Sequence, residues 1–176
     1  MATRDAIGDL VSKMQEERAR LLAVIAALNE AEAESAPAAA EGEAQWSAKQ
    51  QCSHLAEMES NYRAWVEEAR LAENPDVSRV RGSAVAIPLE RAHEHTVQRH
   101  IDSLENERHT TLRMVSAMLP EEFDRKATHQ LFGTLSLLQW LRSYYRHDRM
   151  HVDQISGREP EYKPRFARSR EPDRRR

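Results

Sequence analysis

Two histidines spaced four residues apart near the end of the chain are the residues best placed to do chemistry. His147 and His151 lie in the segment SYYRHDRMHVDQI. On an α-helix, residues at this spacing share a face, with Cβ atoms about 6 Å apart. Two such imidazoles can ligate one metal ion, as the histidines of an H-E-x-x-H motif do. Tyr144, Ile155 and, more obliquely, Trp140 lie near this face and should turn it inward. An isolated pair is also compatible with two half-exposed histidines that bind nothing, so a metal site needs a third ligand.

His54 is the best candidate for the third ligand. It lies beside the apolar stripe of an expected helix, next to Leu55 and one turn before Met58. Taken alone, a histidine in this position is more simply an ordinary core residue. Its value as a ligand therefore depends on whether the fold brings it to the H-x3-H pair.

The other histidines are weaker candidates. His93, His95 and His100 share one expected helix, but no two of them are three or four residues apart. His93 and His100 would be roughly 10 Å apart along the helix axis, too far to share an ion easily. We expect His109 to face solvent. We expect His129 to lie in a loop, where it could pack as a hinge or line the mouth of a pocket.

Four helical segments must position these side chains. Apolar residues recur at helical spacing over about residues 4–31, from Ser47 to Pro75, over 89–119, and from Thr134 or Ser136 to Gly157. Ser47 and Gln50 form a capping box at the start of the second segment. The stretch before it, AEAESAPAAAEGEAQ, is acidic and rich in small residues, so it reads as a loop.

The connection between the second and third helices is long enough to cross the bundle. Residues 74–89 span 16 positions, which reach at most roughly 50 Å when extended. A second helix of about 26 residues is roughly 39 Å long. The connection therefore allows these helices to run parallel, and it equally allows a slack loop between antiparallel neighbours.

The segments QWSAKQQCSHLAEME and HQLFGTLSLLQWLRSYYRHDRMHVDQI resemble the DinB-like superfamily, also called DinB/YfiT-like. The shared pattern is a Trp-Ser pair at the start of the second helix and a His in its first turns. A His–Gly–leucine-rich run follows much later and ends in H-x3-H and Gln-Ile. In this chain the matching residues are Trp46, Ser47, His54, His129, Gly133, His147, His151, Gln154 and Ile155. The layout agrees over about residues 7–157, whereas 66–120 match only in helical pattern and length.

The resemblance implies an all-α fold, an up-down-down-up four-helix bundle with a long crossover between helices 2 and 3. It also implies that His54, His147 and His151 gather at one end of the bundle around one divalent ion, usually zinc or nickel. Three neutral imidazoles leave coordination positions for water or substrate, as in catalytic sites. Members of the superfamily include thiol-dependent S-transferases and isomerases that use bacillithiol or mycothiol. No motif here marks a clamp for such a low-molecular-weight thiol, so this cofactor is expected only from the family.

Two functions remain open on these grounds. The first is a metal-dependent enzyme, a thiol-dependent S-transferase or hydrolase, that acts on a small-molecule substrate. The second is a non-catalytic bundle that binds or sequesters a ligand, with a structural or vestigial metal. An open coordination position facing a roomy, partly polar pocket would favour the enzyme, and a filled, dry core around the histidines would favour the binder. A ferritin-like di-iron bundle fails on ligand count, because it needs two Glu-x-x-His elements and only Glu90–His93 is present.

Several further residues have weaker signals. Asp148 and Asp153 could orient a ligating imidazole, but exposed charges on a helix flank are the simpler interpretation. The same interpretation applies to Glu57 and Glu59. Cys52 is the single cysteine, which excludes an internal disulfide framework, and we expect it to be a small buried core residue.

Composition and charge limit the remaining properties. A chain of 176 residues with a net charge of −3 suits one domain with a tail. The N-terminal segment is charged throughout and lacks the apolar core of a signal peptide. No stretch approaches the roughly 18 apolar residues of a membrane span. We therefore expect a cytoplasmic protein without a membrane partner, divided into a bundle over residues 1–157 and a basic C-terminal extension over 158–176.

Two features bear on partners. The extension over 158–176 has eight Arg or Lys against four Asp or Glu, which leaves a net charge of −7 for the rest of the chain. Its Tyr162 and Phe166 could stack on bases, but without a basic patch on the bundle we expect them to pack on the bundle instead, with no nucleic-acid partner. The first helix has apolar residues on more than one stripe, so we expect a homodimer that buries the widened face.

Overall fold

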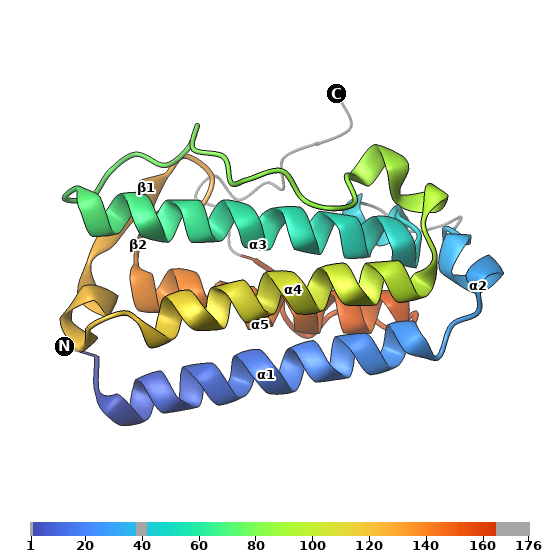
Figure 1. Cartoon of the computed structure of the whole chain (residues 1–176), viewed down its shortest axis with the longest axis horizontal. Coiled ribbons are helices and arrows are strands. Elements are labelled where there is room, and N and C mark those ends of the chain that lie inside the picture. The colour runs from blue at the N-terminus through green and yellow to red at the C-terminus, as the bar shows by residue number, and fades with distance from the viewer. Residues whose placement is uncertain (1, 38–41, 165–176) are drawn as a thin grey trace.

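Four long helices make up most of the molecule (Figure 1). The computed structural model describes residues 2–37 and 42–164. The helices are α1 (Arg4–Ala26), α3 (Ala48–Leu71), α4 (Val97–Ser116) and α5 (Leu137–Ile155). In Figure 1, α1 and α5 run in one direction and α3 and α4 in the other. The predicted up-down-down-up four-helix bundle is therefore confirmed.

Short elements connect the long helices. They are α2 (Glu30–Glu34), the short 3-10 helices η1 (Gly42–Gln45), η2 (Leu89–Glu94) and η3 (Pro120–Asp124), and the strands β1 (Lys126–His129) and β2 (Gly133–Ser136). The two strands form an antiparallel hairpin in which Lys126 pairs with Ser136 and His129 pairs with Gly133. The loop expected before the last helix is thus a hairpin.

Side-chain caps set where the helices begin. The predicted capping box of Ser47 and Gln50 opens α3, and Ser136 opens α5 in the same way. Two predicted boundaries are wrong because a capping residue interrupts the apolar pattern. Asn29 starts the separate helix α2, so α1 ends earlier than expected. Thr96 accepts a hydrogen bond from a backbone N–H in the first turn of α4, so this helix begins at Val97 instead of Leu89.

The connection between α3 and α4 runs back along α3 and makes these helices parallel (Figure 1). The indole N–H of Trp65 donates to the carbonyl oxygen of Val80 at 3.1 Å. The backbone N–H of Gly82 donates to Oδ1 of Asn61 at 2.8 Å. A Cβ atom at position 82 would lie 2.3 Å from the carbonyl carbon of Ser60. The crossover is therefore held against α3 at a point where only glycine fits.

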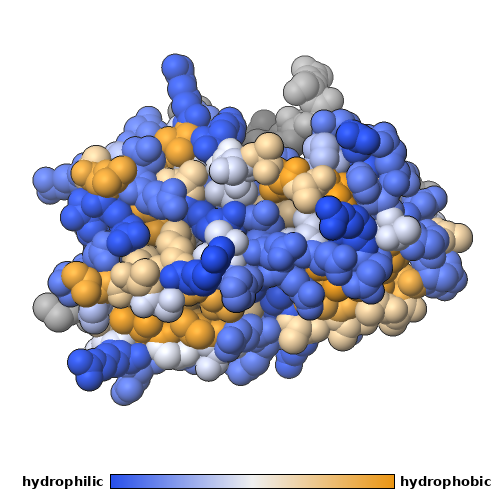
Figure 2. Space-filling model, in the orientation of Figure 1, coloured by the Kyte–Doolittle hydropathy of each residue, from blue (hydrophilic) through white to orange (hydrophobic). Residues whose placement is uncertain are grey.

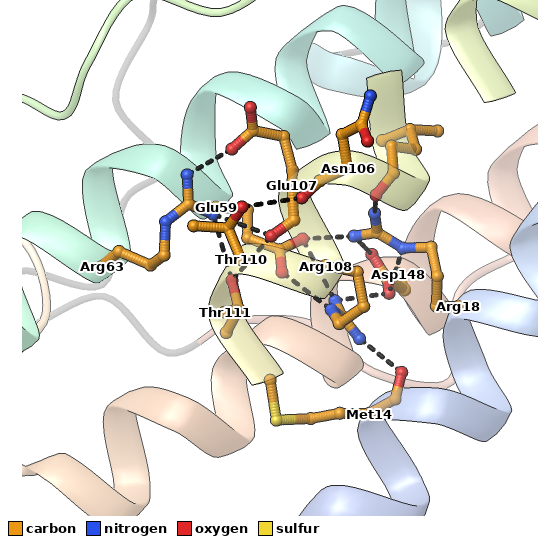
Figure 3. Close-up of polar contacts among 11 residues, drawn as sticks. Met14, Arg18, Glu59, Arg63, Asn106, Glu107, Arg108, Thr110, Thr111 and Asp148 are labelled. Carbon is orange, nitrogen blue, oxygen red and sulfur yellow. Dashed lines mark hydrogen bonds and ion pairs between the residues drawn. The ribbon is translucent and has the colours of Figure 1, made fainter. Parts of the chain in front are cut away.

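A layer of four buried charges divides the core of the bundle into two apolar parts (Figure 3). Each long helix contributes one residue to this charge layer: Arg18, Glu59, Arg108 and Asp148. Arg18 donates to both carboxylate oxygens of Asp148 at 3.0 Å and to Glu59 at 2.5 Å. Arg108 donates to Glu59 at 2.7 Å and to Asp148 at 2.8 Å. With two positive and two negative groups the layer is neutral, as a buried ion cluster must be.

The expectation that Asp148 and Glu59 are exposed is therefore wrong. Their side chains are 1% and 3% exposed. Each carboxylate meets arginines from other helices, and spacing along one helix cannot reveal such a partner. Glu57 is exposed, as expected, and Cys52 is buried, as expected.

The first residues of the C-terminal extension lie against α5. The guanidinium carbon of Arg146 is 5.7 Å from the ring centroid of Tyr162, and Arg158 forms an ion pair with Asp153 at 3.0 Å. Tyr162 thus packs on the bundle, whereas Phe166 lies outside the described residues. Figure 2 shows a face in which charged and polar residues surround small apolar areas. Across the described ranges, no helix combines the length and apolar character needed to span a membrane.

Candidate metal centre

The structure brings the three predicted histidines together between α3 and α5. His54 lies near the start of α3, and His147 and His151 lie one turn apart near the end of the antiparallel α5. The Nε2 atom of His147 is 3.3 Å from Nε2 of His54 and 3.1 Å from Nε2 of His151. Three imidazole nitrogens from two helices therefore point at one position.

A fourth group, the carboxylate of Glu43 in η1, completes this cluster. Its oxygens lie 3.2 Å from Nε2 of His54 and 3.6 Å from Nε2 of both His147 and His151. One ligand atom from each of the four residues lies within 4.8 Å of all the others. Glu43 was not predicted from the sequence, because nothing distinguishes it from the other glutamates of an acidic, Ala-rich stretch that reads as a loop.

A hydrogen bond behind His151 fixes how this histidine presents its Nε2 atom. Nδ1 of His151 lies 2.8 Å from Oε1 of Gln51. The amide nitrogen of Gln51 in turn donates to the carbonyl oxygen of Trp46 at 3.0 Å, so its Oε1 faces His151 as an acceptor. Nδ1 of His151 must then hold the proton, and its Nε2 faces the cluster with a free lone pair. The Trp46 ring packs edge-on against His54, with centroids 4.9 Å apart.

Burial and neighbouring charges set the protonation of the cluster. Burial lowers the pKa of His151 well below its ordinary value of 6.5, and His147 and His54 lower it further. Burial alone would raise the pKa of Glu43, but the imidazoles of His147 and His54 hold it well below its usual range. A neutral imidazole beside an ionised carboxylate is a donor set that suits a divalent cation.

The spacing of the donor atoms also fits one ion. Zinc–nitrogen bonds of 2.0–2.1 Å separate neighbouring ligand nitrogens by about 2.9–3.4 Å at tetrahedral or octahedral angles. The separations of 3.1 and 3.3 Å around His147 fall within this range. The residues present therefore fit the divalent ion that the sequence resemblance implies.

A small cavity borders the cluster on its inner side. It is lined by His147, the two tyrosines Tyr62 and Tyr144, Leu55, and three members of the charge layer. Its size matches about one water molecule. The hydroxyl of Tyr144 is buried and makes no hydrogen bond within the described part of the chain. Burial raises the pKa of this hydroxyl well above 10, so it keeps its proton.

The other histidines lie elsewhere. Nε2 of His93 is 2.9 Å from the hydroxyl of Ser47, and Nε2 of His100 is 2.9 Å from the carbonyl oxygen of Ala92. His109 is exposed, as expected. His129 is buried in β1, with its ring centroid 4.7 Å from that of Trp65. Among the residues that the structure describes, none of these joins the cluster around His147.

The chain belongs to the DinB superfamily, whose sequence model matches residues 13–155. This membership agrees with the resemblance drawn from the Trp-Ser and H-x3-H segments. No curated protein is a significant match to the sequence.

Several solved structures match this chain, among them the following two. YfiT from Bacillus subtilis, described as a probable metal-dependent hydrolase with an unusual four-helix bundle topology, superposes with a TM-score of 0.71. The match has 14% sequence identity and covers 89% of this chain and 87% of YfiT. An uncharacterised protein from Clostridium difficile 630 matches with a TM-score of 0.63 and 8% identity, over 86% of this chain and 94% of that protein. At these identities the two matches show the bundle topology alone.

Proposed function

We propose that this protein binds one divalent ion, zinc or nickel, through His54, His147 and His151, and that it is a metal-dependent enzyme acting on a small molecule. The convergence of the three Nε2 atoms at 3.1 and 3.3 Å carries the proposal. The description of YfiT as a probable metal-dependent hydrolase supports hydrolysis as the reaction. Transfer of a low-molecular-weight thiol is the second reaction that such a site suits.

The proposed chemistry depends on how the protein holds its imidazoles. A divalent ion supplies Lewis acidity that makes a water or a thiol a better nucleophile at neutral pH. Gln51 holds the proton of His151 on Nδ1, which leaves Nε2 as a ligand. Burial keeps His151 neutral, so protons compete weakly for this nitrogen. The protonated hydroxyl of Tyr144 lines the cavity beside His147 and can donate to a bound water there.

A second function is favoured by one specific observation, the position of Glu43. Its carboxylate lies 3.2–3.6 Å from all three imidazole nitrogens, so it can fill a fourth coordination position. Zinc sites with four protein ligands are typically structural, whereas catalytic sites keep one position open. The small cavity beside His147 points the same way. A non-catalytic bundle with a structural metal is therefore the alternative.

Elemental analysis of the purified protein tests metal binding. We expect about one divalent ion per chain in the wild type and a clear loss in the alanine variants of His54, His147 and His151. His109→Ala is the matched control, because it removes an exposed imidazole on another helix. A wild-type protein that binds no ion after incubation with zinc or nickel would overturn the proposal.

An activity screen separates the two functions. The metal-loaded protein should be tested against small esters and amides, and against electrophiles with and without bacillithiol or mycothiol. Turnover without a thiol identifies a hydrolase, and turnover that needs the thiol identifies a transferase. A stoichiometric ion with no turnover of any class would favour the structural metal.

The proposal also covers the assembly of the protein, its C-terminal extension and its location. We propose a homodimer that buries the wide apolar face of α1, where Val11, Leu22 and Val24 are only partly buried within the chain. A monomeric mass by light scattering at micromolar concentration would contradict it. We further propose that residues 158–176 are an extension outside the bundle domain, with its first part packed on α5. We also propose that the protein acts in the cytoplasm without a nucleic-acid partner.

A further inference from the structure

Glu43 differs from the three histidines in the element that supplies it. The histidines come from long helices packed in the bundle, and the side chains of His54 and His151 are 4% and 0% exposed. Glu43 comes from the single turn η1, in which no residue is buried, and its side chain is 16% exposed. Gly42, which opens this turn, has a φ of +60°, a left-handed conformation that favours glycine. A short, half-buried turn thus supplies the carboxylate for an otherwise rigid cluster.

The distances suit Glu43 as a direct ligand, and without an ion the same carboxylate accepts hydrogen bonds from His54 and His147. A carboxylate that acts as a base through a water on the ion would stand about 5 Å from the imidazole nitrogens, given usual bond and hydrogen-bond lengths. The observed separations are 3.2, 3.6 and 3.6 Å. These are close to the spacing of atoms that share one coordination sphere. With an ion bound, Glu43 would therefore take the position that a substrate or nucleophile needs.

The surroundings indicate from which side an incoming donor can arrive. On the inner side, the cavity beside His147 has room for about one water molecule and ends at the charge layer. The flanks are the packed helices α3 and α5. The turn η1 supplies Glu43 to the cluster and, unlike α3 and α5, contains no buried residue. We therefore expect a donor from solvent to arrive on the side of η1, at the place of Glu43, whose side chain is 16% exposed.

We propose that Glu43 is an exchangeable fourth ligand, which closes the metal site at rest and gives up its position to a small anionic donor, a thiolate. This inference rests on the proposed metal site. In such an exchange a thiol would lose its proton to solvent, and its sulfur would take the coordination position that the Glu43 oxygen leaves, with each electron pair staying on its own donor atom. Both donors carry one negative charge, so the half-buried site keeps its net charge. The fourth position would thereby pass from a protein side chain to a nucleophile, as a catalytic metal site requires.

Cobalt(II) substitution tests whether Glu43 is a ligand. Its visible spectrum reports the number and type of ligands. Glu43→Gln keeps the shape and removes the charge, and Glu57→Gln, an exposed glutamate on α3, is the matched control. We expect Glu43→Gln to change the visible spectrum and to weaken cobalt affinity by at least about tenfold, the lower limit for partners that only orient ligands. The control should match the wild type, and melting of the metal-free proteins checks that both variants fold.

Titration with 2-mercaptoethanol tests the exchange, with ethylene glycol as a control of similar shape. We expect the thiol, but not the glycol, to produce a sulfur-to-cobalt charge-transfer band in the wild type, and to do so at lower concentration in Glu43→Gln. Identical cobalt spectra and affinities for the two proteins would show that Glu43 is no ligand, while the three-histidine site would stand. A thiol band missing from the wild type would show that Glu43 does not exchange. A wild type that binds no cobalt would instead contradict the proposed function itself.

Discussion

Gln51 and His151 face each other across the interface of α3 and α5, with Oε1 of Gln51 2.8 Å from Nδ1 of His151. Both side chains are buried, at 2% and 0% exposure. A neutral imidazole can place its proton on either nitrogen, and this contact places it on Nδ1. The choice leaves Nε2 directed at His147 and Glu43, so one hydrogen bond between helices prepares the cluster for a cation.

Gln51→Leu should weaken metal binding while leaving all three histidines in place. The substitution removes the acceptor for Nδ1–H at similar volume, and loss of such a partner typically lowers metal affinity about 10–100-fold. Gln98→Leu, an exposed position on α4, should leave the affinity unchanged. Competition with a chromophoric chelator measures both, and equal affinities for the two variants would contradict the role of Gln51.

Metal removal should lower the melting temperature of the wild type. The proposed ligands bridge α3 and α5, so an ion bound only to the folded state stabilises it, by about 2.7 kcal/mol when its concentration is 100-fold above the dissociation constant. The comparison is melting with added metal and with chelator, for wild type, His151→Ala and His109→Ala. Only His151→Ala should lose the difference. If it keeps a wild-type response, the ion binds elsewhere.

The metal-dependent rise in melting temperature should become smaller at acidic pH, because protons compete with the ion for imidazole nitrogens. The pKa of His151 is well below 6.5 in the folded protein, so protons compete for this ligand only well below pH 6.5. Melting at pH 7.5, at pH 5.5 and at lower pH, with and without metal, measures the effect, and the loss from His151 should come mainly at the lowest pH. A larger metal-dependent rise in melting temperature at pH 5.5 than at pH 7.5 would contradict this prediction.

Asp148→Asn should destabilise the metal-free protein strongly. Asp148 accepts hydrogen bonds from Arg18 and Arg108 in the charge layer. Removing one member of a buried ion cluster leaves uncompensated charge and costs about 3–5 kcal/mol. Lys13→Ala breaks the exposed ion pair with Glu16 and should cost at most about 1 kcal/mol. Urea unfolding measures both, and similar small values would mean that water reaches the layer.

The charge layer should also make the fold sensitive to acid. Burial alone would raise the pKa of Glu59, but Arg18 and Arg108 lower it to about 2, below the ordinary value of about 4.3 in the unfolded chain. The unfolded state then binds more protons in this interval, so the stability from Glu59 is present above about pH 4.3 and is lost as the pH falls toward 2. The stability of Glu59→Gln should therefore decline less over this interval than that of the wild type. Urea unfolding at several pH values measures both.

Gly82→Ala should loosen the crossover between α3 and α4. The added Cβ would meet the backbone of Ser60 at 2.3 Å, and overpacking of this kind costs about 1–3 kcal/mol. The matched control is Gly8→Ala in α1, where a Cβ has open space and should stabilise the helix by about 0.5–1 kcal/mol. The free energy of unfolding, measured with denaturant, should therefore fall in Gly82→Ala and rise in Gly8→Ala.

The sequence by itself determined the parts of this protein that depend on local periodicity. Four residues along a helix always return to the same face, so the H-x3-H spacing already placed His147 and His151 side by side. A capping side chain satisfies backbone groups within its own turn, so Ser47 marked the start of α3 and Thr134 or Ser136 that of α5, where the structure has Ser136. The chain length between α3 and α4 allowed the crossover, and the family resemblance selected it and joined His54 to the pair.

Only the tertiary structure decided which residues meet across elements. Arg18 and Asp148 are 130 residues apart in sequence, and Gln51 and His151 are 100 apart. Periodicity indicates whether such side chains face inward or outward, but it does not show which residue lies opposite them. The sequence therefore indicated an exposed charge at Asp148. Glu43 belongs to no periodic element at all. Its place over the three histidines arises because Gly42 and Trp46 fold a single turn back onto the bundle, and packing, not local spacing, fixes that path.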